Sequence, residues 1–219
     1  MLTYNDIKNN EAIKTYISKA DETLIALGYT EHSFAHVTKV AEAVKYILET
    51  LGYDEHTIEL AQIAAHMHDI GNLINRDEHA QSGAVMAFRI LDKLGMDAED
   101  TAVIISAIGN HDEGTGVPVN TVAAALILGD KSDVRRTRVR NSDIASFDIH
   151  DRVNYSVESS EIKISDDKKS ITLNLVIDAR YSSVMDYFEI FMQRMIMCRK
   201  AAEKLCLSFK LVMNGQQLL

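Results

Sequence analysis

The stretch from residue 64 to residue 71 reads Ala64-Ala65-His66-Met67-His68-Asp69-Ile70-Gly71. It places an imidazole and a carboxylate side by side, His68 and Asp69, at the end of an apolar helical pattern that Gly71 stops. Neighbouring side chains on a helix point about 100° apart, so both can reach one cation only from an edge of the core-facing side. The carbonyl groups that end a helix carry partial negative charge, which favours a nearby cation. The stretch therefore predicts a metal site at the carboxyl end of a helix.

Four other side chains of metal-binding type occur in separate helical patterns. His36 lies inside an apolar pattern, and His79 follows His68 after a short polar loop. His111 and Asp130 each end an apolar pattern. A lone histidine of this kind is usually a hydrogen-bonded core residue, and a buried carboxylate is costly without a cation. Together with the pair above, six candidate ligands arise from five helices, and this ordered set predicts a metal centre.

The set resembles the HD-domain superfamily of metal-dependent phosphohydrolases. The positions that carry the resemblance are, in order, His36, His68, Asp69 and Asp130. The resemblance covers roughly residues 30–135 and implies an all-helical fold with a one-metal site at these positions. His79 and His111 look like the extra ligands of the two-metal members, so two divalent ions are expected.

A narrower likeness lies in the loop that reads His111-Asp112-Glu113-Gly114-Thr115-Gly116-Val117-Pro118. It is similar to a loop of the HD-GYP cyclic-dinucleotide phosphodiesterases. It departs at Asn110, where that family has a histidine, at Val117, where it has a tyrosine, and in being shorter. Asn72 also replaces the lysine that usually follows the His-Asp-Ile-Gly run. These departures argue against hydrolysis of cyclic di-GMP and against a third metal ion, while the two-metal site stays expected.

The resemblance implies a hydrolytic reaction in which His68 and Asp69 are catalytic. Asp69 bridges two divalent ions together with a hydroxide, which attacks a phosphate ester of a nucleotide or related small phosphorylated molecule. The other ligands are divided between the ions, His36 and Asp130 for one, His79 and His111 for the other. Imidazole and carboxylate suit Fe, Mn, Zn, Co or Ni, so the ligand types do not identify the metal. Phosphomonoesterase and phosphodiesterase activity both stay open.

Basic residues close to the ligands in sequence are candidates for substrate binding. Lys131 directly follows Asp130, Arg135 comes shortly after it, and Arg76 precedes His79. A run of basic residues more often forms a solvent-exposed face, so the expectation of substrate binding rests only on the nearness of these residues to the ligands in sequence.

The composition limits the class of protein. A chain of 219 residues with 47% hydrophobic residues predicts a packed globule with an appended subdomain. The net charge of -9 argues against a binder of nucleic acid polymers, which needs a basic face. No run approaches the ~18 consecutive apolar residues of a membrane span, and the first residues lack a secretory signal. Cys198 and Cys206 lie about 12 Å apart on one predicted helix, too far for a disulfide, which fits a cytoplasmic location.

Residues 6 to 147 read as successive helices, and the pattern then changes. The expected helices are Asp6–Leu27, Ser33–Leu51, Asp54–Asp69, one from Asp77 to before Gly95, Asp97–Asn110 and Pro118–Asp130. The tail has period-two patterns that predict strands at 155–164, 170–178 and from 207, with a helix at 183–205 before the last. We therefore expect a mainly α fold, with an HD-type helical bundle over residues 1–147 and a small C-terminal α+β (β-β-α-β) subdomain of unknown role over residues 148–219.

Two other functions stay open at this point. Some two-metal HD proteins resemble this ligand set but use di-iron to activate O2 and oxidise a substrate carbon. The second possibility is a protein without catalytic activity, whose tail serves ligand sensing or oligomerisation, for example as a homodimer. The full ligand set favours an enzyme, because buried carboxylates without a cation cost stability. The remaining histidines are not expected to be ligands: His32, His56, His66 and His150.

Overall fold

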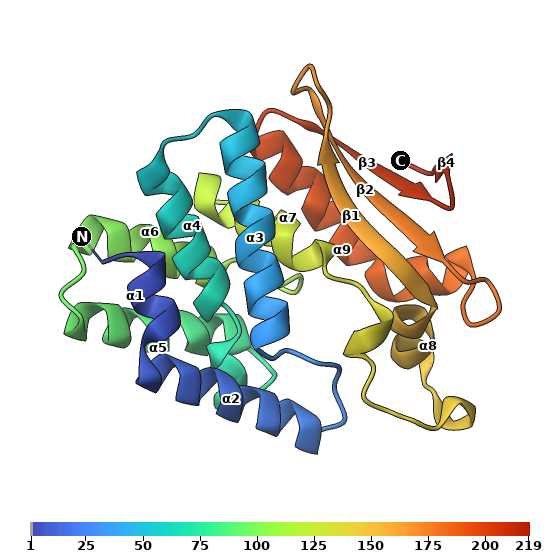
Figure 1. The fold of residues 1–219 in the computed structure, drawn as a ribbon, viewed down its shortest axis with the longest axis horizontal. Coiled ribbons are helices and arrows are strands. Elements are labelled where there is room, and N and C mark those ends of the chain that lie inside the picture. The colour runs from blue at the N-terminus through green and yellow to red at the C-terminus, as the bar shows by residue number, and fades with distance from the viewer. Residues whose placement is uncertain (1) are drawn as a thin grey trace.

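The computed structural model describes residues 2–219, and Figure 1 shows a helical bundle with a small sheet along one side. The helices of the bundle are α1 (Tyr4–Asn9), α2 (Glu11–Ala26), α3 (Phe34–Leu51), α4 (Glu55–Met67), α5 (His79–Lys93), α6 (Ala98–Gly109) and α7 (Thr121–Ser132). The chain continues with α8 (Ile149–Ser156), β1 (Val157–Ile164), β2 (Ser170–Ile177), α9 (Val184–Lys204), β3 (Ser208–Met213) and β4 (Gln216–Gln217). Short 3-10 helices lie at Ile70–Leu73, Arg136–Arg138 and Ile144–Ser146.

Several helix ends follow the capping signals in the sequence. Ser33 accepts a hydrogen bond from a first-turn amide of α3, and Gly52 ends that helix with a φ of 88°. Asp54 and Asp97 cap α4 and α6 in the same way. The expectation of a mainly α fold with a C-terminal α+β part is confirmed.

The first expected helix is in fact two helices. Asn10 is extended (φ -73°, ψ 120°), and its side chain accepts hydrogen bonds from two amides of α2. It therefore ends α1 and caps α2. The helix expected to follow Asp77 begins only at His79, because Glu78 adopts a left-handed φ of 55°.

Other boundaries move for local reasons. Helix α4 stops at Met67 and does not reach Asp69, which leads into a 3-10 helix instead. Helix α7 begins at Thr121 and not at Pro118, because Asn120 accepts a hydrogen bond from an amide of its first turn. Helix α8 and strand β4 were not expected from the sequence, and α8 delays the start of β1 to residue 157.

The segment after α4 lies directly on the backbone of α5. A Cβ added at Gly71 would lie 1.9 Å from the His79 carbonyl oxygen and 2.5 Å from the Gly83 amide nitrogen. A Cβ added at Gly83 would lie 3.2 Å from the His68 carbonyl oxygen. Since neither glycine has a Cβ, the two backbones can approach this closely, and the approach brings His79 beside Asp69.

Helix α7 is the central helix of the fold. It packs against α3, α4 and α6 on one side and against α9 on the other. Small residues such as Ala123, Ala124 and Ala125 are fully buried along it and allow this close packing on several sides.

The four-stranded sheet has the order β1-β2-β3-β4. Strands β1 and β2 form an antiparallel hairpin, and β3 lies parallel to β2 after a crossover through α9. The core under the sheet contains Leu175 and Met195 from the tail but also Ile47 and Leu128 from α3 and α7. The sheet is thus packed onto the bundle (Figure 1), and the division at residue 147 stays a prediction. In the chain from residue 2 onward, the helices are too short or too polar to cross a bilayer.

We predict that Gly71→Ala lowers the free energy of unfolding by about 3 kcal/mol or prevents folding, because the added methyl group meets backbone atoms that must move. Urea denaturation measures the effect. Gly109→Ala is the matched control, since its Cβ would meet the Ala84 methyl group at 3.6 Å, an ordinary contact. Equal stability of the two variants would show that the close approach does not constrain the fold.

Candidate metal centre

The structure brings the six predicted ligands together at the centre of the helical bundle. They lie on α3 (His36), just after α4 (His68 and Asp69), at the start of α5 (His79), just after α6 (His111) and on α7 (Asp130). Each of the six is at most 9% exposed. Five separate elements of the fold therefore converge on one buried point.

Four side chains form a first group of ligand atoms. His36 Nε2 lies 3.3 Å from His68 Nε2, 3.6 Å from Asp69 Oδ2 and 3.3 Å from Asp130 Oδ1. His68 Nε2 lies 3.2 Å and 3.7 Å from the same two oxygens. Ligands held ~2.1 Å from one tetrahedral ion would be about 3.4 Å apart, so these atoms could hold a single cation.

A second group lies on the other side of the Asp69 carboxylate. His79 Nε2 lies 3.2 Å from His111 Nε2, and these two nitrogens are 3.5 Å and 3.9 Å from Asp69 Oδ1. Asp112 Oδ1 is 3.9 Å from His79 Nε2 and is half-buried at the edge of this group. Asp69 therefore offers Oδ2 to the first group and Oδ1 to the second.

The tautomers of the four imidazoles follow from their hydrogen bonds. The Nδ1 atoms lie 2.7–3.0 Å from groups that only accept, namely the Asp133 carboxylate for His36 and the carbonyl oxygens of Ala65, Arg76 and Ile108 for His68, His79 and His111. Each Nδ1 therefore donates, so each ring points an Nε2 lone pair at the centre when that ring is neutral. Lone pairs and carboxylate oxygens this close repel one another unless a cation lies between them, so the donor set fits a divalent metal.

The electrostatics of the centre also favour a cation. Burial disfavours the charged form of His68, but the Asp69 and Asp130 carboxylates outweigh it and raise its pKa to about 10. Burial and the neighbouring His68 and Lys131 charges lower the pKa of His111 to about 3, which keeps that ring neutral. The pKa values of both carboxyls lie well below their usual range; burial opposes this shift, but His68 beside Asp69 and Lys131 beside Asp130 prevail. Two ionised carboxylates therefore face a single protonated imidazole at the centre.

Two polar side chains that had no assigned role orient the ligands. Asp133 accepts the hydrogen bond from His36 Nδ1 and also receives one from Arg135 Nε at 2.9 Å. Asn72 Nδ2 donates to Asp69 Oδ1 at 3.0 Å. One feature of the sequence pointed to Asp133: it follows the ligand Asp130 by three positions, at the end of α7.

The three basic residues predicted to bind substrate have different positions. Arg76 Nη1 lies 3.4 Å from His79 Nε2 and lines a cavity beside the centre. Lys131 is buried, with Nζ 2.7 Å from Asp130 Oδ2. Arg135 lies elsewhere, in a surface groove, with its guanidinium bound to Asp133 and Glu31. Arg135 follows Lys131 by four positions, but it does not line the cavity, because the chain turns after α7 ends.

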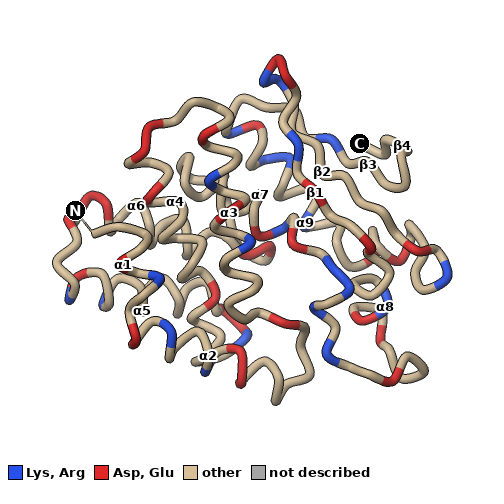
Figure 2. Tube along the Cα trace, in the orientation of Figure 1, with Lys and Arg blue, Asp and Glu red and all other residues tan. Residues whose placement is uncertain are grey.

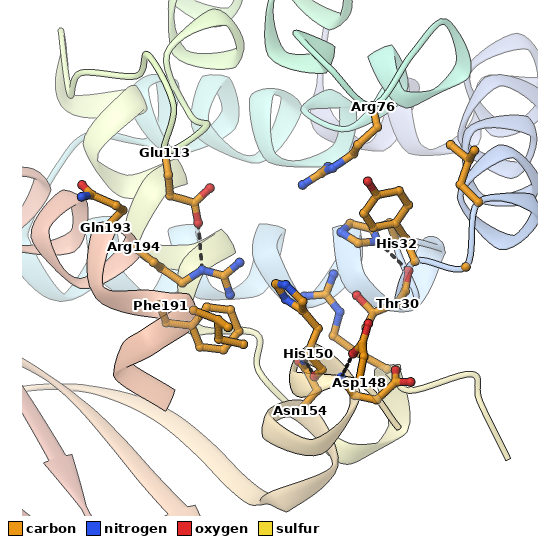
Figure 3. A pocket seen from close by; sticks show the side chains of 16 residues that line it. Thr30, His32, Arg76, Glu113, Asp148, His150, Asn154, Phe191, Gln193 and Arg194 are labelled. Carbon is orange, nitrogen blue, oxygen red and sulfur yellow. Dashed lines mark hydrogen bonds and ion pairs between the residues drawn. The ribbon is translucent and has the colours of Figure 1, made fainter. Parts of the chain in front are cut away.

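The cavity beside the centre has a volume of about 620 Å³. Figure 3 shows Glu113 and Arg194 at the left of it, Arg76 across from them at the upper right, and the α8 residues His150 and Asn154 below. Its lining adjoins the ligands, since Arg76 contacts His79, as described above. Neither Glu113 nor Arg194 was expected at the site from the sequence, and Arg194 lies on α9, far outside the segment that carries the ligands.

The distribution of charge agrees with an acidic protein. Figure 2 shows acidic and basic residues interspersed over the elements, apart from a short basic stretch between α7 and α8. That stretch includes Arg138, which is buried and donates to the carbonyl oxygens of Glu31 and Asp133. It is therefore largely structural.

The other histidines belong to neither ligand group. His56 Nε2 pairs with Asp100 on the surface, 2.8 Å away, and His66 is buried against the Tyr4 ring. His32 and His150 line the cavity. His32 also packs its ring edge-on against that of His36, with the ring centroids 5.5 Å apart.

The sequence matches the family model described as HD domain over residues 33–189. This chain belongs to the HD domain family. HD domains bind divalent metals, and two overlapping clusters of this chain, His36-His68-Asp130 and His68-Asp69-His111, could hold them. An uncharacterized protein of Methanocaldococcus jannaschii is 25% identical over 190 residues, which cover 76% of this chain and 73% of the relative. No solved structure matches the chain.

We predict that binding of Mn²⁺ releases about one proton per chain near pH 7.5, because His68 keeps its proton up to a pKa of about 10 and a metal requires the neutral ring. Protons compete with the metal, so the apparent affinity rises as the pH rises, about tenfold per unit between pH 7 and 9. Titration calorimetry in two buffers of different ionisation enthalpy measures the release. A binding enthalpy that does not depend on the buffer would refute this prediction.

Proposed function

We propose that this protein is a metal-dependent phosphohydrolase that cleaves a phosphate ester of a small phosphorylated molecule, such as a nucleotide. The observation that carries the proposal is the Asp69 carboxylate, whose two oxygens belong to two adjacent groups of ligand atoms. Carboxylates that can bridge a pair of ions are typical of enzymes that cleave phosphate esters. Membership of the HD domain family supports metal-dependent hydrolysis in general.

The residues of the chain prepare the site for this chemistry. When bound, the divalent ions supply an activated water as nucleophile and positive charge that stabilises the phosphoryl oxygens. The Nδ1 contacts hold each imidazole with its lone pair inward, and Asn72 fixes the Asp69 carboxylate. The burial of the ligands keeps bulk water away from them, which strengthens the electrostatic interactions inside.

The nucleophile is not expected to be a cysteine. Cys198 is buried on α9, and burial raises its pKa to about 12, so it stays a thiol near neutral pH. Attack by water agrees better with a site built from imidazoles and carboxylates.

The cavity supports a small substrate rather than a polymer. Its volume of about 620 Å³ lies within the ~300–1,000 Å³ range of small-molecule sites. Arg76 reaches into it from the side of His79, where it would meet a phosphoryl group held at the second group of ligands (Figure 3).

The test is hydrolysis of p-nitrophenyl phosphate, bis(p-nitrophenyl) phosphate and a set of nucleotides by Mn²⁺-loaded protein. We expect turnover of at least one of them, and Asp69→Asn should lower kcat/KM at least ~100-fold, because it removes a carboxylate charge from both ligand groups. His56→Ala is the matched control, since it removes a surface histidine outside both groups.

The same assay without O2 separates hydrolysis from oxygenation, because only oxygenation consumes O2. Equal rates with and without O2 agree with the proposal. Metal-loaded protein that hydrolyses none of these esters, or a fully active Asp69→Asn variant, would exclude it.

A further inference from the structure

Glu113 bridges two cations between the metal centre and the cavity. Its Oε2 lies 3.1 Å from Lys131 Nζ, and its Oε1 accepts a hydrogen bond from Arg194 Nε at 2.9 Å. Lys131 Nζ also contacts Asp130 Oδ2, while Asp130 Oδ1 belongs to the first group of ligands. The Glu113 carboxylate therefore lies in the wall of the cavity, one residue away from a metal ligand.

Arg194 is held in place but keeps free donors. Its guanidinium lies over the Phe191 ring, 4.1 Å from the ring centroid, which fixes its plane. In the structure from residue 2 to residue 219, neither of its Nη atoms has a hydrogen-bond partner, and neither is a buried unsatisfied atom. Figure 3 shows this end of the guanidinium directed away from Glu113 and into the cavity. Such an arginine is preorganised to bind an anion with two oxygens.

The loop that carries Glu113 is anchored at one end and open at its tip. A Cβ added at Gly116 would lie 2.4 Å from the carbonyl oxygens of Asn110 and Asp112 and 2.5 Å from Met197 Cε, so this end is packed against α9. At Gly114 an added Cβ would meet only the Asp112 carboxylate, at 3.5 Å. The tip of the loop beside Glu113 is therefore less tightly packed than its base at Gly116.

We propose that Lys131 and Arg194 form a clamp for the terminal phosphate of the substrate, and that the Glu113 carboxylate occupies this clamp in the ligand-free protein. The inference rests on the proposed function and specifies its substrate class as phosphate monoesters. When Glu113 leaves, the Lys131 ammonium and the Arg194 guanidinium both face the cavity. The nearby Asp130 carboxylate does not replace Glu113, because it is already a ligand of the metal centre. A monoester dianion restores the balance of charge better than a diester, which carries one negative charge.

The inference also gives the C-terminal part of the chain a role in the site. Arg194 comes from α9, which crosses over between β2 and β3 and packs against α7 beside Lys131. The ligand-bearing helices and the sheet must therefore be folded together for the clamp to form.

The experiment measures the dissociation constant of inorganic phosphate for the Mn²⁺-loaded protein by titration calorimetry. Arg194→Met should weaken phosphate binding at least ~10-fold while the Mn²⁺ content stays unchanged. Arg199→Met is the matched control, because it removes the same charge from an exposed position of the same helix and should change the constant less than twofold. Equal effects of the two substitutions, or no phosphate binding by the unchanged protein, would overturn the clamp.

Glu113→Gln tests the occupant of the clamp. It keeps the shape of the side chain but removes the competing charge, so phosphate binding should tighten about 3- to 10-fold. Unchanged or weaker binding would show that Glu113 supports the site and does not compete for it. Arg194→Lys should give an intermediate affinity, and it serves as the readout if the methionine variant does not fold.

The substrate class has a separate readout. Arg194→Met should raise KM for p-nitrophenyl phosphate at least fivefold more than for bis(p-nitrophenyl) phosphate, with kcat less affected. An equal rise for both would overturn the preference for monoesters. If no ester is hydrolysed but the phosphate affinities of the variants follow the expected order, the proposed function is wrong and the anion site is supported. If an ester is hydrolysed but the phosphate affinities do not follow that order, the clamp is wrong and the proposed function is unaffected.

Discussion

The shortage of positive charge around Asp69 is the constraint on which the rest of the structure depends. Two buried carboxylates, the inward lone pairs of His36, His79 and His111, and one protonated imidazole, His68, lie 3.2–3.9 Å from their neighbours, an arrangement that is costly unless cations occupy it. Each ligand is held by a second contact, so the site does not relax by turning its side chains outward. The ligand-free protein is therefore less stable because of this site, and binding of a metal would stabilise the fold.

The packing of the bundle serves this convergence. The glycine pair Gly71 and Gly83 lets the segment after α4 rest on α5, which sets His79 beside Asp69. The alanines of α7 let four helices approach it, and α7 carries Asp130 into their midst. The small residues at these places let the backbones approach closely, and this close approach brings the metal ligands together.

The fold class could be predicted from the sequence, and the six candidate ligands could be chosen from it, because both depend on residue type and local pattern. His68-Asp69 at the end of an apolar helix needs only its neighbours to be recognised, and Asp130 likewise. The contacts around the ligands depend on tertiary structure, so Asp133 and Arg194 could not be assigned from the pattern. Arg135 shows that nearness in sequence is not nearness in the fold: substrate binding was predicted from its position after Asp130, and the turn after α7 directs its guanidinium to Glu31. Helix α8 was missed because it is short and polar, with capping by Asp148 as its main support.

The most direct test of the metal centre is anomalous diffraction from crystals grown with Mn²⁺. We predict two peaks on either side of the Asp69 carboxylate, each about 2.1 Å from one of its oxygens. One peak would lie among His36, His68 and Asp130, and the other beside His79 and His111. A single peak, or peaks away from Asp69, would contradict the shared carboxylate on which the proposed chemistry rests.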